Sequence, residues 1–130
     1  MQALLGGYDR PDLNTIEKNR FADSIKIIDN YKTIGELIPF RPNTYIVVMT
    51  IGYRSDEIVI RALFERDFKY FGVLGSKAKM KTLLTALAKE GFSKDRLNRI
   101  RTPIGLAINS RTPDEIAISV AAEIISVKNS

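Results

Sequence analysis

The residues best suited to chemistry in this sequence lie between Gly72 and Lys79, in the stretch GVLGSKAK. Gly75 allows the backbone to turn tightly, and Ser76 can cap the helix that follows or turn its hydroxyl toward an anion. The free N–H groups at the start of that helix, together with Lys77 and Lys79, would attract a phosphate. The stretch therefore predicts an anion cradle, although a capped helix start with solvated lysines is the simpler interpretation of the pattern.

Two other short stretches could contribute to the same kind of site. Asp9 and Arg10 follow strand-like residues, and in dinucleotide-binding folds an acidic residue after a strand binds ribose hydroxyls. Thr50 and Gly52 follow the apolar run YIVVM, at the end of an expected strand where parallel sheets bind ligands. Tyr53 could stack on a base there. A turn aspartate remains the simpler interpretation of Asp9, and an ordinary boundary tyrosine is as plausible for Tyr53.

Several kinds of site are excluded by composition. The 130 residues include no histidine and no cysteine, so the chain lacks the commonest general base, the commonest metal ligand and any thiolate. Carboxylates do not cluster at the spacing of metal ligands, and the sequence has no G-x-S-x-G motif. We therefore predict no catalytic residue and no metal site.

Positive charge is concentrated in one segment. The chain has a formal net charge of +5, and eight lysines and arginines lie between Ser76 and Arg101 against Glu90 and Asp95 alone. The remainder of the chain is therefore close to neutral. A basic chain of this kind permits nucleic-acid binding. The absence of aromatic residues within the basic helix, with only Phe92 nearby, disfavours that function.

Apolar runs of strand length alternate with helical patterns along the whole chain. We expect strands at Tyr45–Thr50, Tyr70–Leu74 and Ile104–Ile108, with shorter candidates at residues 1–8 and 24–28. We expect helices over residues 56–67 after an N-cap at Ser55, 77–90, 93–100, and onward from the capping box TPDE at Thr112. The last helix should bury Ile116, Ala117, Val120, Ala121 and Ile124. This alternation predicts a single α/β domain over residues 1–130, with a doubly wound, mostly parallel Rossmann-like sheet and helices on both faces.

Taken in order, these stretches resemble the C-terminal Rossmann domain of the XdhC/CoxI family over about residues 8–127. The matching motifs are DRPDLNT at 9–15, NRFAD at 19–23, VMTxG at 48–52, GVLGSKxK at 72–79, PIGLxI at 103–108 and TPxEIAxSxAAEI at 112–124. By that resemblance, Gly75, Ser76, Lys77 and Lys79 match a family loop of glycine and serine followed by basic residues. Thr50 and Gly52 match the family's threonine-glycine pair, and Asp9 and Arg10 match its acidic motif.

The resemblance implies a function as well as a fold. Members of the family are maturation factors for molybdenum hydroxylases such as xanthine dehydrogenase. They bind the molybdenum cofactor, aid its sulfuration with a cysteine desulfurase and pass it to the apo-enzyme, as chaperones rather than turnover enzymes. Because molybdopterin carries a phosphate and often a nucleotide, it is a suitable ligand for an anion cradle.

The chain also departs from the family pattern. By the resemblance we expect it to be without the first strand and glycine-rich loop that precede the DRP motif, and without the N-terminal XdhC/CoxI domain. It also has Tyr53 where the family often has histidine. The missing strand is the central one in the strand order 3-2-1-4-5-6, so its neighbours must pair directly or leave two exposed edges. Since exposed edges invite pairing with another chain, we expect a homodimer or a strand-swapped assembly.

Three other functions compete with the maturation factor. A truncated, self-associating domain without a ligand would explain the missing loop. A nicotinamide-dependent oxidoreductase is disfavoured because the pyrophosphate would lack its close backbone contact. A nucleic-acid binder is disfavoured because the basic helix lacks aromatic residues. The sequence offers no apolar run of membrane-spanning length and no signal peptide, which favours the cytoplasm.

Overall fold

The computed structural model describes residues 2–6, 23–28, 30–39 and 41–130. In chain order the elements are β1 (Gln2–Gly6), β2 (Ser24–Ile28), the 3-10 helix η1 (Ile34–Leu37), β3 (Tyr45–Val48), α2 (Tyr53–Leu63), β4 (Tyr70–Val73), α3 (Lys77–Lys89), α4 (Lys94–Leu97) and α5 (Pro113–Lys128). The alternation of strands and helices confirms the predicted α/β class. Within the described residues no helix is both long and apolar enough to cross a membrane.

The strands form two separate parallel pairs. β1 pairs with β2 from Gln2↔Ser24 to Gly6↔Ile28, and β3 pairs with β4 from Tyr45↔Tyr70 to Val48↔Val73. Among the described strands, β1 and β3 are not hydrogen-bonded to each other. The parallel direction confirms the predicted sheet. The described strands thus form two two-stranded sheets and not one continuous sheet.

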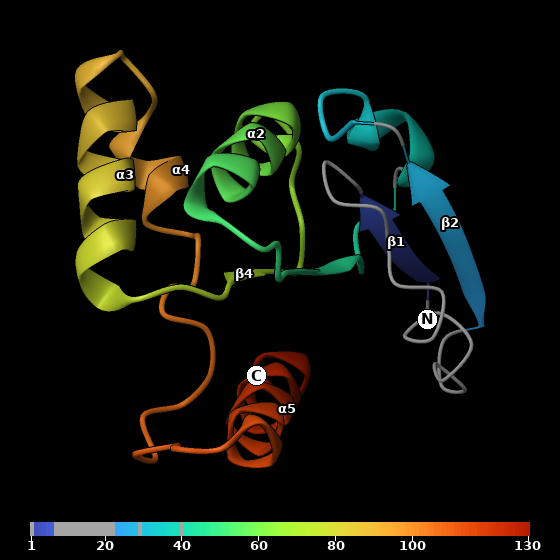
Figure 1. Cartoon of the computed structure of the whole chain (residues 1–130), viewed down its shortest axis with the longest axis vertical. Coiled ribbons are helices and arrows are strands. Elements are labelled where there is room, and N and C mark those ends of the chain that lie inside the picture. Colours follow the sequence, from blue (N-terminus) through green and yellow to red (C-terminus); the bar gives the residue numbers. More distant parts are fainter. Residues whose placement is uncertain (1, 7–22, 29, 40) are drawn as a thin grey trace.

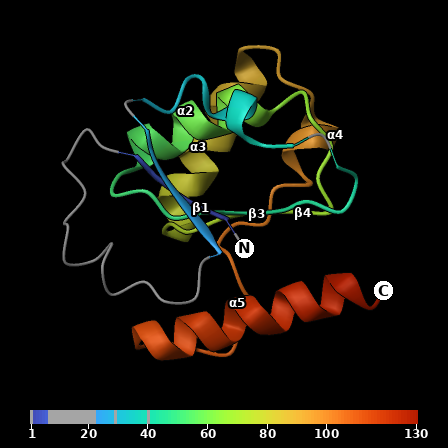
Figure 2. The same cartoon turned by 90° about the vertical axis from the view of Figure 1, so that its right-hand side faces the viewer.

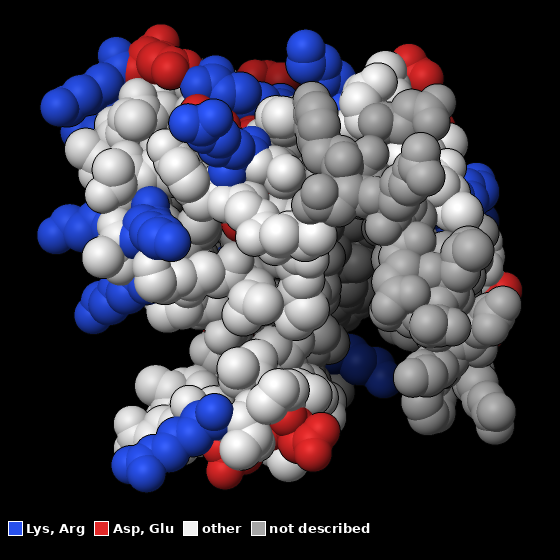
Figure 3. Space-filling view, in the orientation of Figure 1, with Lys and Arg blue, Asp and Glu red and all other residues white. Residues whose placement is uncertain are grey.

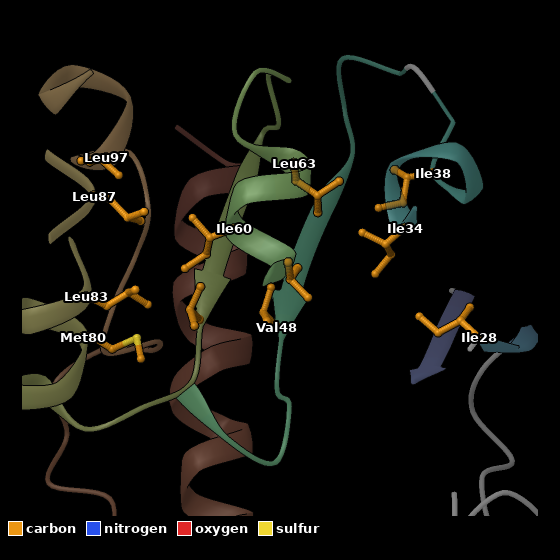
Figure 4. Packing of buried hydrophobic residues seen from close by; sticks show 12 residues of the cluster. Ile28, Ile34, Ile38, Val48, Ile60, Leu63, Met80, Leu83, Leu87 and Leu97 are labelled. Atoms are coloured by element: carbon orange, nitrogen blue, oxygen red, sulfur yellow. The ribbon is translucent and has the colours of Figure 1, made fainter. Parts of the chain in front are cut away.

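Helices cover both faces of the β3–β4 sheet, as predicted. Figures 1 and 2 show α2 and α3 on one face and α5 on the other. Val48, Ile60, Leu63 and Leu83 belong to the main core on the α2–α3 side, and Ile28 joins that core from β2 (Figure 4). A smaller cluster of Tyr70, Ile104 and Val120 fills the α5 side. The two strand pairs therefore share one apolar core.

Three helix starts follow the sequence and one does not. Ser76 and Ser93 cap α3 and α4, and Thr112 begins α5 with a full capping box. The prediction of Ser55 as the cap of α2 is wrong, because the helix begins at Tyr53, three residues earlier than expected, with Gly52 as its N-cap. Gly52 makes no side-chain capping bond, so no sequence signal marks this helix start.

The predicted strand at Ile104–Ile108 is not formed. The chain touches β4 through one bridge, Gly72↔Arg101, in which the Arg101 N–H donates to Phe71 and its carbonyl accepts from Val73. Two features prevent further strand pairing with β4 beyond this bridge. Pro103 has no N–H to donate, and Gly105 adopts φ +95°, outside the extended region.

α5 is tied to the start of β4 by a buried carboxylate. The Tyr70 hydroxyl donates to Glu123 Oε1 at 2.6 Å, and the Gly105 N–H donates to the same oxygen at 3.2 Å. Arg101 Nη1 lies 3.9 Å from the other carboxylate oxygen. Burial, followed by the hydrogen bond to Glu123, raises the pKa of Tyr70, so the hydroxyl keeps its proton. This contact was not anticipated from the sequence.

Candidate functional site

The carboxyl ends of β3 and β4 bring two of the predicted stretches together. The strands end in register at Val48 and Val73, and the Leu74 N–H donates to the Val48 carbonyl at 2.9 Å. The chain then leaves β3 through Thr50 and leaves β4 through the loop before α3. Both turns therefore lie at one end of the sheet, called here the carboxyl edge, where open parallel sheets bind ligands.

The turn from Gly75 to Lys79 forms a capped helix start. Ser76 Oγ accepts a hydrogen bond from the Lys79 N–H at 3.3 Å, so the hydroxyl serves the helix cap. Lys77 and Lys79 are exposed. The first turn of α3 presents the N-terminal end of a 13-residue helix, which carries partial positive charge. The capping interpretation of Ser76 is confirmed, and anion binding by this turn stays a prediction.

Gly75 is required for a reason that differs from the predicted tight turn. A Cβ atom at Gly75 would lie 2.9 Å from Met80 Cε and 3.1 Å from Met80 Cγ. Met80 is 2% exposed and belongs to the main core. The absent side chain at Gly75 therefore lets α3 pack its first turn closely under the loop.

Thr50, which is half-buried, and the buried Asp56 form a polar pair at the same end of the sheet. Thr50 Oγ1 lies 2.6 Å from Asp56 Oδ1 and 2.9 Å from the Gly52 carbonyl oxygen. Asp56 is 3% exposed, and its burial raises the pKa of the carboxyl group, against the lowering effect of the Thr50 hydroxyl. The hydroxyl has one proton, so it satisfies only one of these acceptors at a time. A protonated Asp56 would satisfy both, because it would donate to Thr50 while Thr50 donates to Gly52.

A small pocket joins the two turns. It has a volume of about 290 Å³ and is lined by Tyr53, Ala78, Lys79 and Thr82. Tyr53 is 45% exposed, so its ring is accessible in this pocket. The pocket places an aromatic ring and a lysine side by side, which is an arrangement suited to a ring compound that carries negative charge.

The predicted residues have different outcomes. Thr50, Gly52, Gly75, Ser76, Lys77 and Lys79 all lie at the carboxyl edge. Asp9 and Arg10 lie outside the described residues. Asp56, which the sequence placed only at a helix start, belongs to the site through Thr50; its position six residues after a strand-end threonine was the available signal. No group of three potential metal-binding residues occurs in the part of the chain that the structure describes.

Comparison with known proteins identifies the family. The model of the XdhC Rossmann domain matches residues 8–124. A protein of Bacillus subtilis (strain 168) that is described as a probable subunit of xanthine dehydrogenase is 37% identical over 68% of this chain and 25% of its own length. "Molybdenum cofactor insertion chaperone PaoD" of Escherichia coli (strain K12) is 29% identical over 66% of this chain and 27% of its own length.

A solved structure has the same fold. The crystal structure of a protein described as a xanthine dehydrogenase from Bacillus halodurans superposes with a TM-score of 0.74 and 27% identity. The match covers 97% of this chain and 35% of that one. The chain thus spans about a quarter to a third of the length of these three proteins. On the family match and the agreement of fold, the chain belongs to the XdhC Rossmann domain family.

Proposed function

We propose that this chain is a maturation module for a molybdenum hydroxylase of the xanthine dehydrogenase type, and that it binds the molybdenum cofactor for insertion. The observation that carries the proposal is the meeting of a lysine-bearing helix start with the Thr50–Asp56 pair at one edge of the sheet. Two relatives support it by name, one as a probable part of xanthine dehydrogenase and one as a cofactor insertion chaperone. The chain acts in the cytoplasm as an accessory protein, not as a turnover enzyme.

The residues at the carboxyl edge fit part of the cofactor. The first turn of α3 would receive a phosphate through backbone N–H groups, with Lys77 and Lys79 adding charge. Tyr53 would contact an adjoining ring in the pocket of about 290 Å³. That volume is at the lower limit for small-molecule sites, so the pocket suits a phosphate and one ring. Thr50 and Gly52 would complete the site from the β3 side, and Asp9 and Arg10 are proposed to assist.

Sulfuration is the finer part of the proposal. When bound, the cofactor supplies the molybdenum that receives sulfur. Because the chain has no cysteine, it cannot carry a persulfide on its own side chains. We propose that the sulfur comes from outside these 130 residues, from a cysteine desulfurase. The role of this chain is to hold and orient the cofactor while that transfer takes place.

We also propose that residues 1–130 form one domain and that this domain self-associates as a homodimer or strand-swapped assembly. Among the described strands, β1 and β3 each have a hydrogen-bonded partner strand on one side only, which supports pairing with a second chain. Apolar side chains add to this surface, since Val47 of β3 is 41% exposed, and Ile118 and Ile125 of α5 are 62% and 55% exposed. A clean monomer in light scattering across protein concentrations would contradict self-association.

Calorimetric titration with molybdopterin tests the ligand. The double substitution Lys77→Ala and Lys79→Ala should weaken binding by about tenfold or more, because charge-assisted contacts to the phosphate are lost. Lys89→Ala is the matched control, since this lysine lies at the other end of α3. If the double variant binds as tightly as the original chain, the turn from Gly75 to Lys79 is only a helix start and the ligand is held elsewhere. If the original chain shows no binding, the chain is better described as a domain without this ligand.

A further inference from the structure

A second cleft lies at the opposite edge of the β3–β4 sheet, where β4 begins. It has a volume of about 580 Å³ and is lined by the connection from α2 to β4, by the start of β4 and by residues 96–101. Figure 3 shows basic side chains over the end of α3 and the neighbouring surface. The described lining of this cleft has one acidic residue, Asp67, and five basic residues, which are Arg66, Lys69, Arg96, Arg99 and Arg101.

The charges in this cleft are only loosely neutralised. Asp67 Oδ1 lies 3.3 Å from Arg96 Nη1 and 3.5 Å from Arg99 Nη1, and the Asp67 side chain is 75% exposed. Arg99 is 70% exposed. Exposed ion pairs of this kind contribute little, so an incoming oxyanion can displace Asp67 from the two arginines. Asp67 therefore marks a position where a carboxylate or phosphate oxygen is already accommodated.

An aromatic surface lies beside these cations. Phe68 and Phe71 both line the cleft, with ring centroids 5.6 Å apart and planes tilted by 41°. The guanidinium of Arg66 lies 5.4 Å from the Phe68 ring centroid. Arg66 also donates to the carbonyls of Gly35, Ile38 and Pro39. Its guanidinium therefore has a structural role, and the other basic side chains of the cleft are the ones expected to contact a ligand.

We propose that this cleft is a second ligand site, for a phosphate carried on a flat ring, as in a mononucleotide. Its volume of about 580 Å³ lies within the range of small-molecule pockets and exceeds what an inorganic anion needs. Arginine forks suit phosphate oxygens, and the phenylalanine rings offer a stacking surface. The site lies at the other end of β4 from Gly75 to Lys79, so its occupation does not depend on binding at the carboxyl edge.

Adenosine monophosphate is the probe, titrated into the whole chain and followed by calorimetry. We expect saturable binding that Arg99→Ala with Lys69→Ala weakens by about tenfold or more. The Lys32→Ala and Lys128→Ala double variant is the matched control, since both lysines are exposed and neither lines the cleft, and it should bind the probe as the original chain does. Asp67→Asn removes the competing carboxylate and should strengthen binding, a gain that structural damage would not produce.

Two comparisons separate the ring from the phosphate. Ribose 5-phosphate should bind more weakly than adenosine monophosphate, and Phe68→Leu should weaken only the latter. The proposal is overturned by a lack of saturable binding in the original chain, by binding lost through Lys77 and Lys79 instead, or by weaker binding in Asp67→Asn. Equal affinity for the two phosphates would overturn the ring as part of the ligand. Because these measurements use no molybdopterin, their failure is distinguishable from failure of the proposed function.

Discussion

The two ends of the β3–β4 sheet use positive charge in different ways. At the carboxyl edge, Lys77 and Lys79 lie in the first turn of a capped helix, and the polar pair Thr50–Asp56 lies after β3 at the same end of the sheet. At the opposite edge, arginines and two phenylalanine rings line an open cleft. Lysine acts as a compact point charge beside backbone N–H groups, whereas arginine provides a planar fork that also stacks on rings.

This difference divides a segment that looks uniform in the sequence. The basic stretch from Ser76 to Arg101 includes α3 and α4, and α3 separates its lysine-rich start from its arginine-rich end. A 13-residue helix is about 20 Å long, which exceeds the screening length at physiological salt. The two ends therefore act as separate charged sites.

The largest expected effect is at the opposite edge, where α5 is attached. Glu123→Ala should lower the free energy of unfolding by about 3 kcal/mol, because Tyr70 and the Gly105 N–H lose a buried acceptor. Urea unfolding followed by circular dichroism measures this loss. Glu65→Ala, at an exposed position, is the control and should change stability by less than about 0.5 kcal/mol. A similar small loss for Glu123→Ala would show that α5 is not held by this contact.

A smaller loss is expected at the carboxyl edge from Gly75→Ala. The added Cβ would lie 2.9 Å from Met80 Cε, and moving this flexible side chain within the core should cost about 1–2 kcal/mol. Gly52→Ala is the matched control in the facing turn, where a Cβ meets nothing within 4 Å and φ is −148°. The urea midpoints of the two variants measure the difference. Equal midpoints would mean that α3 adjusts without strain.

The smallest expected effect concerns the charge of Asp56. Its pKa is raised in the folded state, so the folded chain binds this proton more tightly than the unfolded chain does. The contribution of Asp56 to stability is therefore present at low pH and is lost as pH rises from about 3.8 through the folded pKa. Asp56→Asn should remove this dependence, so that the variant gains stability relative to the original chain between pH 4 and pH 7. Urea unfolding at several pH values tests this, and a gain of the opposite sign would mean that the charged carboxylate is the stabilising form.

Local signals in the sequence were sufficient for much of the fold. Ser76, Ser93 and Thr112 mark helix starts because their hydroxyls cap nearby N–H groups, a contact made within three residues. Apolar runs at Tyr45–Thr50 and Tyr70–Leu74 predicted parallel strands, which the structure forms over Tyr45–Val48 and Tyr70–Val73. α2 was misplaced at its start because Gly52 makes no capping contact, and the expected strand at 104–108 failed because Gly105 adopts a positive φ.

The candidate site was predictable in part for the same reason. Thr50, Gly52 and the turn from Gly75 to Lys79 follow strand ends, and the carboxyl ends of parallel strands meet at one edge. The Thr50–Asp56 bond and the cleft at the opposite edge were not predicted. Both depend on how separate elements pack, and the cleft joins residues about 30 positions apart in the chain, such as Asp67 and Arg96.

The last helix, α5, shows which features local sequence determines and which depend on tertiary contacts. The capping box determined where α5 starts, but its apolar residues occur all round the helix and do not define one face. The structure buries Val120 with Ser119 and Glu123, while the predicted Ala117 and Ala121 are exposed. Contact with β4 decides this, because Glu123 must reach the Tyr70 hydroxyl. Local hydrogen bonds and apolar periodicity thus determined the elements and their order. Only packing between distant residues decided which faces are buried, which strands pair and where the cleft at the opposite edge lies.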